Sequence, residues 1–187
     1  MSTDLRLGPI SYLVLGTIAM LGRSTPYGLK RSVQVGVANF WPFPHTQLYA
    51  EPKRLAEAGL LEETREESGR RRRHYTITET GRQRLAEWLS EPAATHTEIR
   101  DLGLLKLFFA ELAEPQAVLA LAREQATAQL AQLAHFEAAL QRYSSRPELA
   151  SRVLPAKLGA RVSHAAAEFW EDIAERQSQA DNDADAA

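Results

Sequence analysis

Two short stretches of the sequence carry side chains suited to binding a polyanion. Residues 45–53, HTQLYAEPK, bring hydroxyl, amide and basic groups together, and a run of arginines follows at Arg70, Arg71, Arg72 and Arg73. Hydroxyl and amide groups bond to base edges, whereas cationic groups bond mainly to phosphates. A short polar helix beside a basic hairpin is a way of holding DNA, so we expect a double-stranded DNA partner.

The first stretch has two different faces if it is helical. At about 100° per residue, Leu48, Pro52 and Leu55 share one face, with the spacing of a buried row. The small, polar and basic side chains lie opposite or at the edges: Thr46, Gln47, Tyr49, Ala50, Lys53 and Arg54. Pro52 removes the hydrogen bond to the Leu48 carbonyl and predicts a kink. We therefore expect a buried row and a free face that contacts DNA.

The neighbouring segments predict the elements that position this helix. The apolar residues 10–21 predict a buried helix, and Ser24, Thr25 and Pro26 form a strong start signal for a second helix over residues 26–35. Gly59 ends the third helix, and two strands flank a turn at residues 67–70. Thr78 then caps a helix over residues 79–90. This order of three helices, a two-stranded wing and a helix is that of a winged helix.

The charge is unevenly distributed along the 187 residues. Residues 1–90 hold 13 Lys and Arg against 9 Asp and Glu, whereas residues 91–187 hold 9 against 15. A basic first half and an acidic second half indicate an anionic partner for the first half alone. We therefore predict a DNA-binding domain over residues 1–90, a helical domain over residues 91–178, and a disordered acidic tail over residues 179–187.

The composition also limits the class of protein. With 44% apolar residues, 25% charged residues and no cysteine, the chain has the composition of a globular protein without disulfides. The first residues lack the basic and apolar segments of a signal peptide. The apolar run at residues 10–21 is too short to span a bilayer. We expect a cytoplasmic protein that has no membrane partner.

The second half is dominated by predicted helices. Residues 99–112 form an apolar segment that predicts one helix, and residues 115–143 predict a long helix because no Gly or Pro follows Pro115. A last helix is expected from about residue 155. Antiparallel packing of the two long helices would leave apolar surface that, together with the first helix, forms a homodimer. The predicted dimerisation residues are Leu119, Ala126, Leu133, Leu140, Leu158, Val162, Phe169 and Ile173.

Residues 5–90 resemble the PadR family of transcriptional regulators. The resemblance lies in LGPISYLVLGTI, TPYGLKRSV, TQLYAEPKRLAEAGLL and RRHYTITETGRQRL. It implies a mainly α-helical, homodimeric repressor with an N-terminal winged helix-turn-helix domain and a C-terminal domain of long helices that builds the dimer. It also implies three groups of DNA-binding residues: Tyr27 and Lys30 on the second helix, Thr46, Gln47, Tyr49 and Lys53 on the recognition helix, and Arg70, Arg71, Arg72 and Arg73 on the wing. Pro52 departs from the commonest family pattern, which affects the docking angle.

Several of these residues have a second interpretation. The arginine run could be a solvated charged face, and Tyr49 could pack its ring while offering only its hydroxyl to a phosphate. His45 could begin the helix instead of contacting a base. Trp41, Trp88 and Trp170 present flat apolar surfaces, and relatives in the family hold aromatic small molecules near the dimer interface. An aromatic effector is therefore a further expectation, with core packing as the alternative.

Patterns typical of catalysis or metal binding are lacking in the sequence. The histidines do not have the spacing of metal ligands, and neither a Gly-rich phosphate loop nor a nucleophile motif is present. We expect no enzymatic activity, metal or cofactor, and predict a sequence-specific DNA-binding regulator. The alternatives are a protein-interaction module, built from a winged helix and a coiled coil, that does not bind DNA, and a small-molecule-binding protein without DNA contacts.

Overall fold

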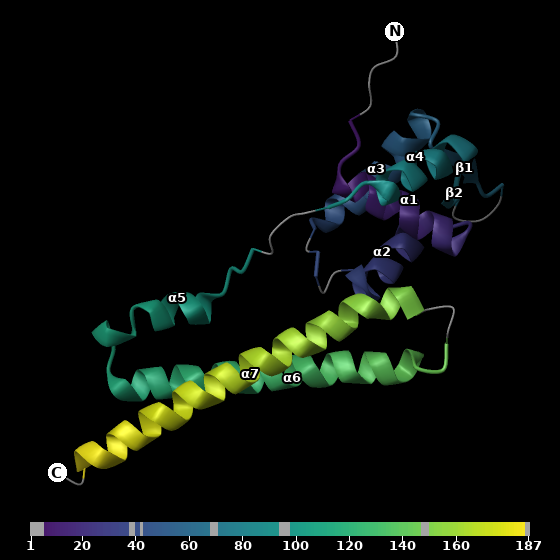
Figure 1. Ribbon diagram of the computed structural model, residues 1–187. Helices are drawn as coiled ribbons and strands as arrows, with labels where there is room; N and C mark the ends of the chain where they lie inside the picture. The colour runs from purple at the N-terminus through teal and green to yellow at the C-terminus, as the bar shows by residue number, and fades with distance from the viewer. Residues whose placement is uncertain are drawn as a thin grey trace. The chain divides into compact units, whose positions relative to one another are not determined.

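The computed structural model describes residues 6–37, 40–41, 43–67, 71–93, 98–146 and 150–185. The chain forms two compact units, Met1–Thr95 and His96–Ala187. Figure 1 labels the helices and strands of both units. Each unit has its own core, so each is described by itself.

The first unit contains four helices and a hairpin among its described residues. In chain order these are α1 (Pro9–Leu21), α2 (Pro26–Val35), α3 (His45–Glu57), β1 (Leu61–Arg65), β2 (Arg73–Ile77) and α4 (Glu79–Ser90). The Thr25 hydroxyl accepts a hydrogen bond from the Gly28 N–H at the start of α2, and the Thr78 hydroxyl accepts one from Gly81 at the start of α4. Both predicted caps are therefore present, and the mainly α-helical winged-helix prediction is confirmed.

The two strands form an antiparallel hairpin, in which Glu63 is paired with Tyr75 and Arg65 with Arg73. The base of the hairpin is tied to the segment between α1 and α2. Ser24 and Tyr75 exchange two backbone hydrogen bonds, of 3.0 and 2.8 Å. These bonds fix where the wing leaves the helical part of the unit.

The core of the first unit joins α1, α2, α3 and the base of the hairpin. Its buried members are Val14, Leu15, Ile18, Leu29, Val33, Leu48, Leu55, Leu60, Leu61, Tyr75 and Ile77. Gly81 of α4 lies so close to this core that a Cβ atom there would come within 2.2 Å of the Leu60 carbonyl oxygen. Only glycine therefore fits at this position of the YTITETG motif.

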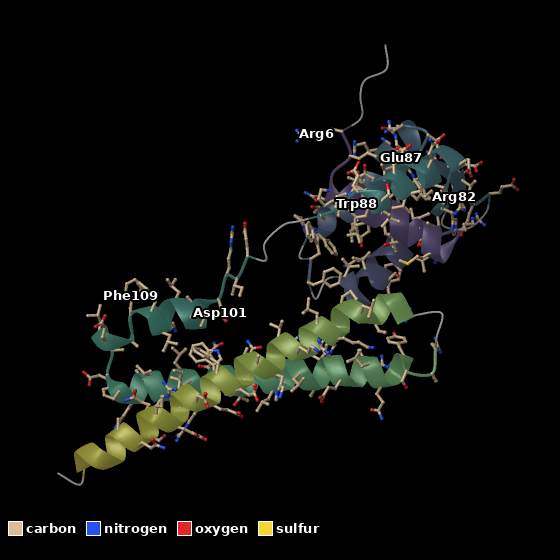
Figure 2. The ribbon with its side chains drawn as sticks, viewed as in Figure 1. Arg6, Arg82, Glu87, Trp88, Asp101 and Phe109 are labelled. Carbon is tan, nitrogen blue, oxygen red and sulfur yellow. The ribbon has the colours of Figure 1, made fainter. Side chains whose placement is uncertain are left out.

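The second unit consists of α5 (Leu102–Phe108), a short 3₁₀ helix η2 (Ala110–Leu112), α6 (Pro115–Tyr143) and α7 (Ala150–Asp185). The single helix expected over residues 99–112 is divided. The Asp101 carboxylate caps α5 by accepting hydrogen bonds from the N–H groups of Gly103 and Leu104, and α5 ends before Phe109. Figure 2 labels both Asp101 and Phe109 at the two ends of this helix. The apolar pattern alone does not show these two ends.

Helices α6 and α7 lie side by side in Figure 1 and run antiparallel. Trp170 of α7 packs against Ala122 and Ala126 of α6. Nearer the connection between the helices, a Cβ atom on Gly159 would come within 2.5 Å of the Phe136 ring. Small residues at these positions thus let two large aromatic side chains fill the space between the helices.

Helix α7 is longer than the sequence pattern predicts. It begins at Ala150, so that Pro155 lies in its second turn, and it continues to Asp185. Residues 179–185 are therefore helical where the acidic composition predicts disorder. Extending an existing helix costs little once it has been nucleated, and the Ser178 hydroxyl bonds back to the Ala174 carbonyl. Among the described residues, no helix combines the length and apolarity needed to cross a membrane.

Candidate nucleic-acid interface

The outward face of α3 carries the polar side chains selected from the sequence. Thr46, Gln47, Tyr49 and Lys53 are all exposed. The side chain of His45 lies outside the described part of the chain. Lys53 pairs with Glu57 at 3.4 Å, but both side chains are more than 60% exposed. Such an exposed pair is weak, so the Lys53 ammonium remains available to a phosphate.

The opposite face of α3 is anchored by apolar packing. Leu48, Pro52 and Leu55 are fully buried, and α3 remains one helix across Pro52. Pro52 packs into the core, although its missing N–H removes the helical hydrogen bond to the Leu48 carbonyl. The predicted buried row is therefore present, and it directs the polar face away from the core.

A polar cluster also anchors α3. The Arg54 guanidinium donates hydrogen bonds to both carboxylate oxygens of Glu51, at 2.9 and 2.5 Å, and to the Ser11 hydroxyl of α1 at 3.0 Å. Burial raises the pKa of Glu51, but the hydrogen bonds from Arg54 and Ser11 and the charge of Arg54 outweigh burial and lower it overall. Arg54 therefore stabilises the fold, unlike its neighbour Lys53.

Helix α2 presents a second polar surface. Tyr27 is exposed and Lys30 is half-buried. Arg31 and Gln34 are exposed as well, and their spacing of four and seven residues from Tyr27 puts them on the tyrosine's face of the helix. These two residues were not among the predicted DNA contacts, although helical periodicity could have indicated them.

The described arginines of the wing differ in their surroundings. Arg71 and Arg72 are exposed, and neither side chain has an ion-pair partner in the part of the chain that the structure describes. Arg71 also has a φ of +46°, which turns the backbone at the end of the loop. Arg73 lies 3.6 Å from Glu63, and Arg70 lies outside the described residues.

Carboxylates organise the side chains of the wing. The Glu66 carboxylate lies 2.9 Å from Nε2 of His74 and also accepts a hydrogen bond from the Arg72 N–H. The hydrogen bond with His74 is the main cause of the lowered pKa of Glu66. Glu63 accepts hydrogen bonds from Arg65 and from the Tyr75 hydroxyl. The hairpin is therefore held by side-chain contacts as well as by its backbone ladder.

The elements that carry the three polar surfaces pack against one another. Helix α3 contacts both α2 and β1, and β1 carries the wing. The first unit thus offers a helix face with hydroxyl and amide groups beside cationic side chains on α2 and the wing. These are the groups that contact base edges and phosphates, respectively.

The three tryptophans have different surroundings. Trp88 of α4 stacks on Tyr12 of α1, with ring centroids 4.5 Å apart, and Figure 2 labels Trp88 in the first unit. Trp41 is exposed, and Trp170 is only 1% exposed between α6 and α7. For Trp170 the position is that of a core residue. An open apolar groove of about 650 Å³ between α5 and α6 is lined by other side chains.

The predicted dimerisation residues also fall into two groups. On α6, Ala126 is buried against α7, and Leu119, Leu133 and Leu140 are half-buried. On α7, Leu158, Val162 and Phe169 are exposed, whereas Ile173 packs against the Trp170 cluster. Within the described residues, no cluster of three or more His, Asp or Glu side chains could hold a metal ion.

Comparison with known proteins gives two family matches that follow the two units. Residues 14–87 match the model described as "Transcriptional regulator PadR-like family". Residues 99–177 match "Virulence activator alpha C-term". The negative transcriptional regulator PadR of Bacillus subtilis is 23% identical over 141 residues, which cover 74% of this chain and 77% of that protein.

Solved structures share the fold along most of the chain. Bacillus subtilis PadR in complex with operator DNA is similar with a TM-score of 0.80 and 21% identity, covering 90% of this chain and 98% of that one. The same protein in complex with p-coumaric acid gives a TM-score of 0.74, with 21% identity and the same coverage. The Vibrio cholerae virulence activator AphA gives 0.68 at 21% identity, covering 91% of this chain and 98% of that one. The first unit therefore carries a domain of the PadR-like family of transcriptional regulators, which confirms the resemblance found in the sequence.

Proposed function

We propose that this protein is a homodimeric repressor that binds operator DNA through α3, α2 and the wing. The observation that carries the proposal is the exposed face of α3, where Thr46, Gln47 and Tyr49 stand free while the opposite face is fixed by a buried row and by Arg54. The operator complex of Bacillus subtilis PadR, a protein with the same fold, supports this assignment.

In this proposal, different kinds of side chain contact the bases and the phosphates. Thr46, Gln47 and His45 contact base edges, and Tyr49 offers its ring or its hydroxyl to the same groove. Phosphates are bound by the outer residues: Tyr27, Lys30, Arg31, Lys53, Arg70, Arg71, Arg72 and Arg73. The protein acts where the DNA is, in the cytoplasm, and requires no catalytic chemistry.

Dimerisation is proposed to use the outer face of α7. Leu158, Val162 and Phe169 share one face of that helix because they are four and eleven residues apart. All three are exposed, while Trp170 packs on α6. A second copy that covers this stripe would present two α3 helices about 34 Å apart, one turn of the duplex.

Footprinting tests the proposal directly. Hydroxyl radicals should reveal two protected half-sites, about 10 base pairs apart, in the DNA upstream of the protein's own gene. A genome-wide pull-down of bound DNA supplies other targets if the gene does not regulate itself. Lack of protection on any captured fragment would instead favour the protein-interaction module.

An aromatic effector is part of the same proposal. A similarly folded structure contains p-coumaric acid, which can serve as the probe. The ligand would act by binding one arrangement of the dimer better than another, because a ligand shifts an equilibrium only through that difference. Titration should change both tryptophan fluorescence and DNA affinity. If this compound and related aromatic acids change neither, the effector role is lost.

The direction of regulation is proposed to be repression. The relative from Bacillus subtilis is a negative regulator, whereas the C-terminal match is to a virulence activator domain. A reporter placed behind a footprinted promoter distinguishes the two outcomes. Deleting the gene should raise reporter expression, and a fall in expression would assign activation instead.

A further inference from the structure

One face of the wing carries a pair of arginines that share a carboxylate. Residues two apart on a strand point to the same side, so Glu63 and Arg65 of β1 lie on the same face as Arg73 and Tyr75 of β2. The register places Arg65 directly opposite Arg73. At the base of the hairpin this face is buried by Tyr75 and the core, and toward the tip it becomes cationic.

Glu63 contacts each of its three neighbours on this face. Its Oε1 accepts a hydrogen bond from Arg65 Nε at 3.0 Å, and its Oε2 accepts one from the Tyr75 hydroxyl at 2.9 Å. The Arg73 guanidinium lies 3.6 Å from Oε2. Like charges that face each other across a hairpin repel, and the shared carboxylate offsets this repulsion.

The arginines are more accessible than the carboxylate that holds them. The side chains of Arg65 and Arg73 are 64% and 43% exposed, whereas that of Glu63 is 19% exposed. Burial raises the pKa of Glu63, but its hydrogen bonds from Arg65 and Tyr75 and the arginine charges outweigh burial and lower it overall. Near neutral pH, two guanidinium groups therefore face solvent above an ionised carboxylate.

We propose that Arg65 and Arg73 form a clamp for one DNA phosphate, and that Glu63 holds the two arginines together in the free protein and competes with the phosphate for them. This inference rests on the proposed function, since it requires the wing to meet DNA. It adds Arg65 to the phosphate-binding residues and gives Glu63 a positioning role that limits affinity.

When Arg65 and Arg73 exchange the Glu63 carboxylate for a DNA phosphate, the net gain in binding free energy is moderate. An exposed ion pair is weak, and guanidinium groups bind phosphate with strong charge-assisted hydrogen bonds. Phosphate binding also releases counterions from the DNA. The arginines therefore transfer to DNA, but the loss of their contacts with Glu63 reduces the net gain. Removing the charge of Glu63 should make binding tighter.

The test compares two single-charge variants on a random-sequence duplex of about 30 base pairs, roughly three helical turns. Glu63→Gln removes the charge but keeps an oxygen that can accept the Tyr75 hydrogen bond. Glu62→Gln is the matched control, because Glu62 is exposed on the other face of the same strand and has no ion pair among the described residues. Both variants change the net charge equally.

Glu63→Gln should tighten binding about two- to fivefold more than Glu62→Gln, the range for releasing an exposed ion pair. This gain should vanish when Arg65 and Arg73 are both replaced by Ala, because the carboxylate then has no arginine to hold. In a second measurement, Arg65→Ala alone should lower the slope of log affinity against log salt by about 0.9.

Equal effects of Glu63→Gln and Glu62→Gln would overturn the inference, because the gain would then be general electrostatics. Weaker binding by Glu63→Gln would overturn it too, as would a gain that persists without the two arginines or an unchanged salt slope in Arg65→Ala. If the unmodified protein bound no duplex at any salt concentration, the proposed function itself would fail, and the clamp with it.

Discussion

Lys53 and Arg54 are adjacent basic residues on α3, yet their side chains have different environments. Arg54 bonds to Glu51 and Ser11 and ties α3 to α1, whereas Lys53 is exposed beside Glu57. The difference follows from their positions on the helix, because 100° of rotation separates consecutive residues. At the residue scale, Arg54 thus stabilises the fold, whereas the neighbouring Lys53 is available to contact DNA.

Replacing Arg54 with Ala should lower the free energy of unfolding by about 1 to 3 kcal/mol, because the Glu51 carboxylate is then left buried without its cationic partner. Lys53→Ala is the matched control and should change stability by less than about 0.5 kcal/mol, as expected of a surface site. Urea denaturation followed by circular dichroism measures both. Equal losses in the two variants would contradict the structural role of Arg54.

The pH dependence of stability follows from the same carboxylate. The pKa of Glu51 is lowered from its ordinary value of 4.5 in the folded protein. The unfolded chain therefore takes up the proton first, so the stabilisation is present above about pH 4.5 and is lost as the pH falls toward the folded pKa. Denaturation between about pH 3 and pH 6 should show this loss. Arg54→Ala should flatten the slope, and an unchanged slope would argue against the pair.

At the scale of elements, α3 and the wing are expected to make different kinds of contact. Replacing Arg71 and Arg72 with Ala should weaken binding to every DNA sequence and reduce the salt slope by about 0.9 for each lost phosphate contact. Anisotropy titrations at several salt concentrations measure both quantities on operator and random DNA. A variant that lost affinity for the operator alone would place these arginines on bases instead.

The sequence predicts these elements well because their signals are local. Thr25 and Thr78 cap the helices where expected, and Leu48, Pro52 and Leu55 form the buried row. A residue whose position depends on pairing with another strand was not predicted. Arg65 stands outside the arginine run, and only the strand register places it opposite Arg73. Two local features were also not predicted: helical periodicity places Arg31 and Gln34 on the face of Tyr27, and the break between α5 and η2 lies at Phe109, inside a continuous apolar segment.

At the scale of the whole molecule, α7 has two apolar faces with different uses. Trp170 fills one face against α6, whereas Val162 lies on an exposed stripe. Heptad spacing finds apolar positions without saying which of them pack within one chain. That is why Ala126 and Val162 appeared together among the predicted dimerisation residues.

Val162→Glu should therefore dissociate the proposed dimer, because a charge buried in an apolar interface costs several kcal/mol. Lys157 is exposed on another face of α7. Lys157→Glu changes the net charge by more than Val162→Glu does, but it should leave the dimer intact. Analytical ultracentrifugation across a concentration series distinguishes the two. If both variants remained dimers, the interface would have to lie elsewhere.

Sequence preference tests the central claim most directly, because the proposed specificity rests on base contacts by the outer face of α3. The measurement is the ratio of dissociation constants for a footprinted operator and for a scrambled duplex of the same composition, in the unmodified protein and in Gln47→Ala. The unmodified protein should prefer its operator by at least about 10³-fold. Gln47→Ala should lose about 1 to 3 kcal/mol of that preference while keeping its affinity for scrambled DNA. A ratio near one in the unmodified protein, or an unchanged ratio in Gln47→Ala, would contradict the account.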